Sequence, residues 1–255
     1  MRVDVPLALV WGFLVVWSRV AGMFAFLPLP GLKTPIDPPR ILLGVLITLA
    51  MFPHWPVIDP SRTAVVDLAM LAIREAVFGL LTGLLVSMLV EVFQLTAQLL
   101  AQQAGFSYAS TIDPTNDTDS GILLVLCQLL SGMLAIAAGL DHYVLNLFRG
   151  SLEQIPSGSF VASLAHLQTA SQLGAKMFET GLLLALPSIA IFIVLDVLLA
   201  VVSRLEQQLQ LTTILFPVKT ASAVFVATIA IGSFPAAFEN MMAATLSALR
   251  AVAGK

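Results

Sequence analysis

The sequence has few charged residues and a single cysteine. Charged residues make up 11% of the 255 residues, hydrophobic residues make up 58%, and the mean hydropathy is +0.97. A soluble domain has about a quarter of its residues charged, so this composition excludes an ordinary soluble fold. Because Cys127 is the lone cysteine, a disulfide framework and a cysteine-based metal site are both excluded. We expect Cys127 to be a buried, inert thiol.

The sequence also lacks the common catalytic motifs. No HExxH, GxGxxG, P-loop or GxSxG pattern occurs. The three histidines are isolated and lack ligand spacing: His54, His142 and His166. A net charge of −3 offers no basic surface for nucleic acid. The sequence therefore predicts a protein that is not an enzyme, with no cofactor, no metal site and no nucleic-acid partner.

Long apolar runs predict an all-α, membrane-associated protein of long kinked helices. The expected helices cover about residues 5–27, 40–52, 61–103, 121–140, 160–208 and 211–253. At 1.5 Å per residue, the third is roughly twice as long as the ~30 Å hydrocarbon core requires. We expect Pro187 to kink the fifth helix, and Pro217 and Pro235 to interrupt the sixth.

Polar side chains recur along one face of two of these helices. At about 100° per residue, each set falls within an arc of about 80°. The α-helical stripes are Ser87, Glu91, Gln94, Gln98 and Gln102 on the third helix, and Gln168, Gln172, Lys176 and Glu179 on the fifth. Two interpretations stay open: the stripes hydrogen-bond helices within an apolar bundle, or they line a hydrated conduit or dock polar subunits. We expect Leu89, outside the stripe, to face lipid.

Charges also occur inside the apolar segments. Arg19 interrupts the first helix, and Asp196 and Arg204 lie eight residues apart on about the same face of the fifth. Because an unpaired charge in an apolar environment is costly, we expect Asp196 and Arg204 each to pair with another element. Basic residues are scattered over nearly every boundary, so they predict no orientation in the membrane.

Residues 105–120 form the only long stretch in mid-chain without a helical pattern. Asp113-Pro114 and the run Asn116-Asp117-Thr118-Asp119 have turn chemistry. The stretch directly follows a helix with a polar stripe. It is either a surface connector or a gating loop.

Several short motifs follow one another in order along almost the whole chain. They are Arg19, Pro30-Gly31, Pro38 with Arg40, Glu75 with Gly79 and Gly83, Gly105-Phe106-Ser107-Tyr108-Ala109 with Asp113-Pro114, His142, Ser151, Ile155-Pro156, Leu186-Pro187, Arg204, and Phe216-Pro217 with Lys219. In this order and spacing they resemble the FliR family of flagellar biosynthetic proteins, and more broadly the matching component of type III secretion export gates. Gln207 stands where the family usually has Pro, and Asp141 where a Gly often precedes the His.

The resemblance implies a core export gate formed with FliP-like and FliQ-like subunits, as a helical assembly of kinked hairpins. That assembly would sit largely above the plane of the bacterial inner membrane, inside the flagellar basal body. FlhB-like and FlhA-like gate proteins and unfolded export substrates would be further partners. The chain would be one helical domain, with an N-terminal region of residues 1–103, a plug-like loop of residues 105–120 and C-terminal hairpins of residues 121–255.

The resemblance also implies roles for particular residues. The plug of the central pore would be formed by Gly105, Phe106, Ser107, Tyr108, Ile112, Asp113 and Pro114. Buried charges or kinks are expected at Arg19, Glu75, Pro187, Asp196, Arg204, Pro217 and Lys219. The chain has no nucleotide site of its own, so the energy source would lie elsewhere.

Three alternatives remain at this point. The first is the homologous component of a virulence-type secretion system, the injectisome. The second is a secondary transporter that uses Asp196, Glu91 and Lys176 as coupling sites, although no inverted repeat is visible. The third is an integral membrane enzyme, for which neither clustered ligands nor a nucleophile motif is present.

Overall fold

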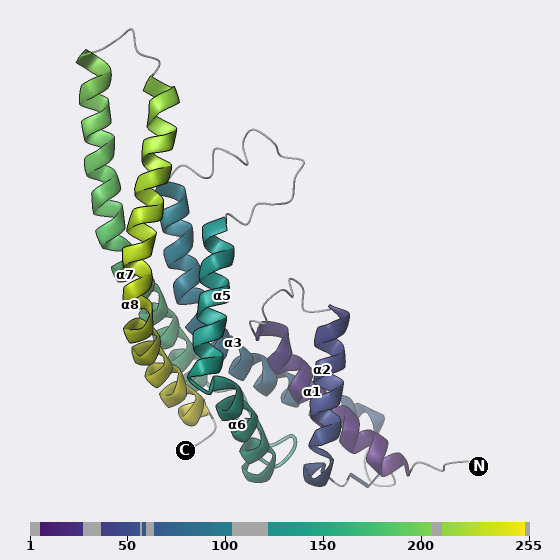
Figure 1. Ribbon diagram of the computed structural model, residues 1–255. Helices are drawn as coiled ribbons and strands as arrows, with labels where there is room; N and C mark the ends of the chain where they lie inside the picture. The colour runs from purple at the N-terminus through teal and green to yellow at the C-terminus, as the bar shows by residue number, and fades with distance from the viewer. Residues whose placement is uncertain are drawn as a thin grey trace. The chain divides into compact units, whose positions relative to one another are not determined.

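The computed structural model describes residues 6–27, 37–56, 58–59, 64–103, 122–205 and 211–252 (Figure 1). All regular structure in these ranges is helical, which confirms the all-α prediction. The elements are α1 (Leu7–Phe26), α2 (Pro38–Ala50), the 3-10 turn η1 (Phe52–His54), α3 (Val65–Gln103), α5 (Ile122–Ala137), α6 (Leu140–Gln154), α7 (Leu164–Leu205) and α8 (Leu211–Val252).

Among the described residues, three helices are long and apolar enough to cross a membrane. They are α1, α3 and the stretch Leu164–Val202 of α7, and α5 with α6 adds a fourth if this bent pair is one span. Only 17% of the most apolar window of α7 is buried within the chain, against 61% in α3. Since α7 leaves so much apolar surface uncovered, it requires lipid or other subunits around it.

The chain forms two compact units. Unit 1 contains residues 1–88, 135–174 and 244–255, and unit 2 contains residues 89–134 and 175–243. The chain passes from one unit to the other inside α3, α5, α7 and α8. Each unit therefore combines segments that are distant in the sequence.

In unit 1, α1 and α3 cross at very short range because glycines lie at the crossing. A Cβ atom on Gly79 would overlap the carbonyl oxygen of Arg19, and one on Gly83 would overlap that of Met23. No side chain fits at either position. Small residues four apart let the two backbones touch, as in helix pairs within membranes.

Arg40 connects α2 to the C-terminal end of α1. Its Nη1 donates to the carbonyl oxygen of Ala25 at 3.2 Å and its Nη2 to that of Leu27 at 2.8 Å. A guanidinium at a helix C-terminus satisfies carbonyls that have no partner inside the helix and interacts favourably with the helix dipole. Arg40 thereby fixes the α1–α2 hairpin, and its side chain is buried.

In unit 2, α3 packs against both α7 and α8. The ring of Phe93 lies 4.8 Å from that of Phe234 and 6.0 Å from that of Phe238, centroid to centroid. A second apolar cluster contains Leu100, Phe192, Ala223 and Val226, with Leu195 against it. These contacts bury large apolar side chains from three helices and form the core of this unit.

The expectation that prolines interrupt the last helix is wrong. Helix α8 runs unbroken through Pro217 and Pro235, which were expected to interrupt it. Each proline removes only one backbone donor, and in apolar helices packed against neighbours such a loss is tolerated. Pro187 likewise lies inside α7, where the expected kink stays a prediction.

The run 121–140, expected as one uncharged helix, is divided. Helix α5 ends at Ala137 and α6 begins at Leu140, with a bend of 62° between the two helices. Gly139 lies in the left-handed region at φ 72°, a conformation that glycine adopts without strain. The helix α6 was missed although its buried residues have helical spacing: Leu140, Val144, Phe148 and Ser151.

Candidate functional site

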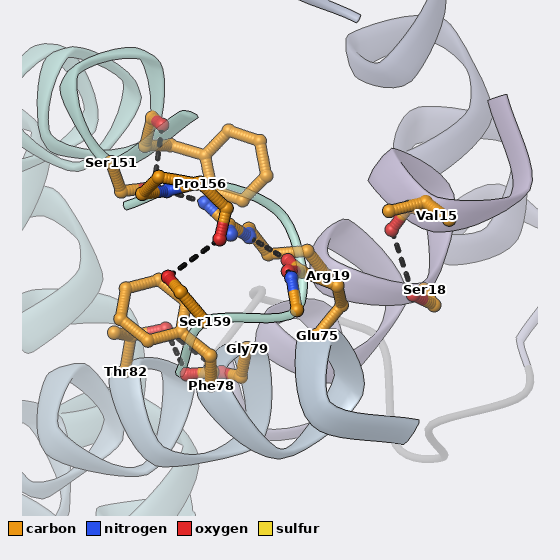
Figure 2. Close-up of polar contacts among 12 residues, drawn as sticks. Val15, Ser18, Arg19, Glu75, Phe78, Gly79, Thr82, Ser151, Pro156 and Ser159 are labelled. Carbon is orange, nitrogen blue, oxygen red and sulfur yellow. Dashed lines mark hydrogen bonds and ion pairs between the residues drawn. The ribbon is translucent and has the colours of Figure 1, made fainter. Parts of the chain in front are cut away.

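Arg19 is a fully buried arginine in unit 1, on α1. Its Nε forms an ion pair with Glu75 of α3, and its Nη1 donates to the hydroxyl oxygen of Ser151 of α6 at 3.0 Å (Figure 2). The guanidinium carbon lies 4.9 Å from the ring centroid of Phe78. A buried charge requires such a partner, because desolvation without pairing costs several kcal/mol. The cluster thereby joins three helices that are distant in the sequence.

Glu75 is also fully buried and serves a second partner. Its Oε1 accepts a hydrogen bond of 2.7 Å from the backbone N–H of Gly158, in the connector between α6 and α7. The preceding residue, Arg74, donates to the carbonyl oxygen of Gly158 at 2.9 Å. Both backbone groups of Gly158 are therefore held by consecutive side chains of α3.

Gly158 is suited to this contact in two respects. Its φ of +81° lies in the left-handed region, which side chains with a Cβ rarely adopt. A Cβ there would also lie 3.2 Å from Cγ of Leu71. The start of α7 is consequently fixed to α3 through a backbone that only glycine fits well.

The chemistry of this cluster is structural. It contains one positive and one negative group in direct contact, plus backbone and hydroxyl partners. Arg19 Nη2 is buried without a hydrogen-bond partner among the described residues, which costs free energy. Buried ion pairs stabilise little compared with apolar packing, yet removing one partner is strongly destabilising. The cluster therefore defines the packing arrangement of unit 1.

The polar stripes lie mostly on the surface of the chain. On α3, Ser87 is buried and donates to the carbonyl oxygen of Leu84 in its own helix at 2.9 Å. Gln94 is half-buried. The exposed members are Glu91, Gln98 and Gln102 of α3 and Gln168, Gln172, Lys176 and Glu179 of α7. This exposure favours surroundings outside the chain over helix–helix hydrogen bonds within it.

Leu89 does not face lipid, contrary to expectation. Its exposed fraction is 0%. At about 100° per residue, Leu89 lies about 20° from Thr96 around α3, and Thr96 contacts α7. The residue therefore belongs to the packed face of the helix.

Other predicted site residues are placed as follows. Asp196 of α7 forms an ion pair with Lys219 of α8, Oδ1 to Nζ 2.5 Å, and both side chains are half-buried. The pairing of Asp196 with another element therefore agrees with expectation. Arg204 lies in α7 and Pro217 in α8. The predicted plug residues, Gly105, Phe106, Ser107, Tyr108, Ile112, Asp113 and Pro114, lie outside the described residues.

Sequence reasoning also missed the polar contacts around Glu153. Nε2 of His54 in η1 lies 3.1 Å from Oε1 of Glu153 in α6, and Nε of Arg149 lies 3.5 Å from the same oxygen. Only the i, i+4 spacing of Arg149 and Glu153 could have been read from the sequence. In the stretches of chain that the structure describes, no group of three or more His, Cys, Asp or Glu residues could hold a metal ion.

Long apolar helices, a tight glycine crossing and a buried ion pair define a multi-helix membrane protein. The sequence matches the model of a family described as bacterial export proteins, family 1, over residues 10–245. The chain belongs to this family, which confirms the predicted resemblance.

Individual relatives cover most of the chain at modest identity. The chain is 24% identical over 209 residues to the flagellar biosynthetic protein FliR of Escherichia coli K12, covering 81% of this chain and 80% of the relative. It is 23% identical over 244 residues to FliR of Bacillus subtilis, covering 93% of each. It is also 24% identical over 211 residues to the surface presentation of antigens protein SpaR of Salmonella typhimurium, covering 82% and 79%.

Proposed function

We propose that the chain is a structural, non-enzymatic component of the flagellar type III protein export gate. The observation that carries this proposal is the family match over residues 10–245. In this role the chain lines and gates the secretion channel together with FliP-like and FliQ-like subunits. It resides in the bacterial inner membrane within the flagellar basal body.

The uncovered surfaces support membership in an assembly. Most of α7 is apolar yet exposed. Large exposed apolar faces mark contacts with lipid or protein. The exposed stripe residues cannot all be satisfied by lipid, where an unpaired polar group costs several kcal/mol. FliP-like and FliQ-like subunits would cover these faces, with FlhB-like and FlhA-like proteins and unfolded substrates as further partners.

The segment 105–120 is assigned the role of a plug in the closed channel. Bulk would come from Phe106, Tyr108 and Ile112, while Gly105 and Asp113-Pro114 set the turns. The segment acts by filling space. The whole chain, 1–255, acts as one export-gate domain in which this segment separates residues 1–103 from 121–255.

A deletion of the gene in its own host tests the proposal. We expect loss of flagellar hook and filament protein from the culture medium and loss of swimming, both restored by the gene on a plasmid. Normal secretion of these proteins by the deletion strain would contradict the flagellar assignment.

The injectisome is the second candidate, because SpaR of Salmonella typhimurium is nearly as similar to the chain as the FliR proteins are. The same deletion strain separates the two. Intact motility with loss of effector secretion on host-cell contact would favour the injectisome, and the reverse result would favour the flagellum.

A further inference from the structure

The bend between α5 and α6 is centred on Gly139, which lies in an open position. Its φ of 72° is in the left-handed region, and the two helices differ in direction by 62°. Gly158, the other described glycine with a positive φ, is held by hydrogen bonds from Arg74 and to Glu75. At Gly139, by contrast, no atom of another described segment lies within 4 Å of the Cβ position. Contacts with a Cβ therefore do not enforce the bend.

The sequence around Gly139 favours one continuous helix. Residues 122–154 contain no proline, and residues 122–140 contain no charged side chain. In the bent form, the N–H groups of Leu140, Asp141 and His142 begin α6, so they have no carbonyl partner inside the helix. The N-cap residue, Gly139, has no side chain that could accept from them. A straight helix would pair these three N–H groups with the carbonyl oxygens four residues earlier.

Packing in unit 1 opposes this gain by fixing α6. The apolar side chains of Val144 and Phe148 are buried, and Ser151 accepts the hydrogen bond from Arg19 at 3.0 Å. The hydroxyl group of Tyr143 also lies 3.4 Å from Nε of Arg250 in α8. A change at the bend therefore moves α5 and leaves α6 in place.

Helix α5 buries only a narrow face within the chain. Its fully described buried residues, Cys127 and Ser131, lie about 40° apart around the helix. Its exposed apolar residues are Val125, Leu126, Leu129, Met133 and Ile136. Elements with few buried contacts are the ones that move at low cost in free energy. Helix α5 can therefore change direction without disrupting a large core.

Building on the proposed function, we propose that Gly139 is a hinge on which α5 moves during export. The α5–α6 pair has two forms, the bent form and a straight form in which residues 122–154 are one helix. Helix α5 begins at Ile122, two residues after the segment 105–120 that is proposed to fill the closed channel. An exported chain that takes the place of this segment pulls on the start of α5 and favours the straight form.

Glycine suits both forms, whereas a residue with a side chain favours one of them. Alanine is disfavoured in the left-handed region and preferred over glycine inside a helix, so Gly139→Ala should raise the ratio of straight to bent form roughly 30-fold. Asparagine is tolerated in the left-handed region, so Gly139→Asn should change this ratio much less. Because the Cβ position is open, the two variants differ in backbone preference and not in packing of the bent form.

Distances between spin labels on the two helices test the hinge. Genetically encoded keto amino acids that carry the labels replace Val125 and Asn146, both exposed, in the full chain within the purified gate complex. Straightening a bend of 62° lengthens the separation of these positions by about 4 Å at 1.5 Å per residue. We expect the longer distance to gain population when an export substrate is stalled in the complex by a tightly folded fusion.

The variants provide the second arm of the experiment, without substrate. Gly139→Ala should populate the longer distance, and Gly139→Asn should keep the wild-type distribution. Gly232→Ala is the control, because it adds the same methyl group in an open position of α8 without a positive φ, and it should also keep the wild-type distribution. If Gly139→Ala does not assemble, the wild type with and without stalled substrate decides.

An unchanged distance in an assembled Gly139→Ala complex would overturn the hinge. An unchanged distance in the wild type with stalled substrate would overturn its coupling to export. Co-purification of FliP-like and FliQ-like subunits is measured on the same samples. Absence of these subunits counts against the proposed function, whereas a complete complex with unchanged distances counts against this inference alone.

Discussion

Single residues determine how α1, α3 and the α6–α7 connector fit together in unit 1. Arg19 and Glu75 neutralise each other in a fully buried position, and Glu75 also holds the backbone of Gly158. Gly79 makes the crossing possible, because the backbone of Arg19 occupies the place of a Cβ. At this helix crossing, the Arg19–Glu75 pair therefore supplies the electrostatic contact, and Gly79 allows the two backbones to approach closely.

Replacing Glu75 with Ala should destabilise the protein by about 3–5 kcal/mol, because it leaves the Arg19 charge buried and unpaired. Glu75→Gln keeps an acceptor for Gly158 and should cost less. Thermal unfolding of the purified gate complex in detergent measures the difference. Asp67→Ala removes an exposed carboxylate from the same helix, and its effect should stay within about 0.5 kcal/mol. Equal melting temperatures for Glu75→Ala and Asp67→Ala would refute the role of the pair.

Replacing Gly79 with Ala should also lower the stability of the complex. The added Cβ would overlap the Arg19 carbonyl oxygen, and overpacking of this kind costs about 1–3 kcal/mol. Gly232→Ala is the matched control, because its Cβ position has no atom of another described segment within 4 Å. The control should be neutral or stabilising by up to about 1 kcal/mol through helix propensity. A Gly79→Ala complex as heat-stable as the control would show that the crossing can relax.

The elements combine packed faces with faces left open. Helix α3 is buried toward α7 and α8 and open along its stripe, while α7 is open along most of its length. The position of a residue around its helix therefore determines whether it packs within the chain or is available to other molecules. Predictions at this scale concern the open faces.

Glu91→Leu should lower export severalfold, because a leucine places an apolar patch on a hydrated polar face. Glu91→Gln keeps hydrogen bonding without the charge and should retain most export. Secreted hook protein, measured by immunoblot at equal amounts of assembled complex, gives the comparison. Equal secretion from the two variants would show that export does not depend on a polar side chain at this position of the stripe.

Deleting Ser110 to Thr118 should leave the helices and the assembly intact but make the closed channel leak. A loop contributes little to core burial, whereas its removal opens the space that it is proposed to fill. The measurement is membrane conductance, or sensitivity to small toxic solutes, compared with wild type at equal complex levels. Normal assembly without increased leakage would make the segment a plain connector.

Sequence reasoning located the long helices, because apolar runs of span length leave few alternatives. It missed the break at Gly139, which lies inside an uncharged run, and gave too much weight to Pro217 and Pro235, which the helix accommodates. The pairing of Arg19 with Glu75, 56 residues apart, depends on a tertiary crossing that no local pattern encodes. Leu89 was misplaced for the same reason, since the partner on its face of α3 comes from a distant helix.

The chain on its own leaves both apolar and polar surfaces exposed. Most residues of its stripes are exposed, much of α7 is uncovered, and its family consists of bacterial export proteins. Lipid can cover the apolar faces but not the polar ones. We therefore expect the chain to require the other gate subunits for stability.

Co-expression followed by affinity purification in detergent tests this claim most directly. A tagged chain produced with its FliP-like and FliQ-like subunits should elute as one monodisperse, protease-resistant complex that contains all three proteins. The same chain produced alone should aggregate or be degraded, because its polar stripes then have no partner. A monodisperse, protease-resistant monomer from the chain alone, with neither subunit retained when they are present, would contradict the account.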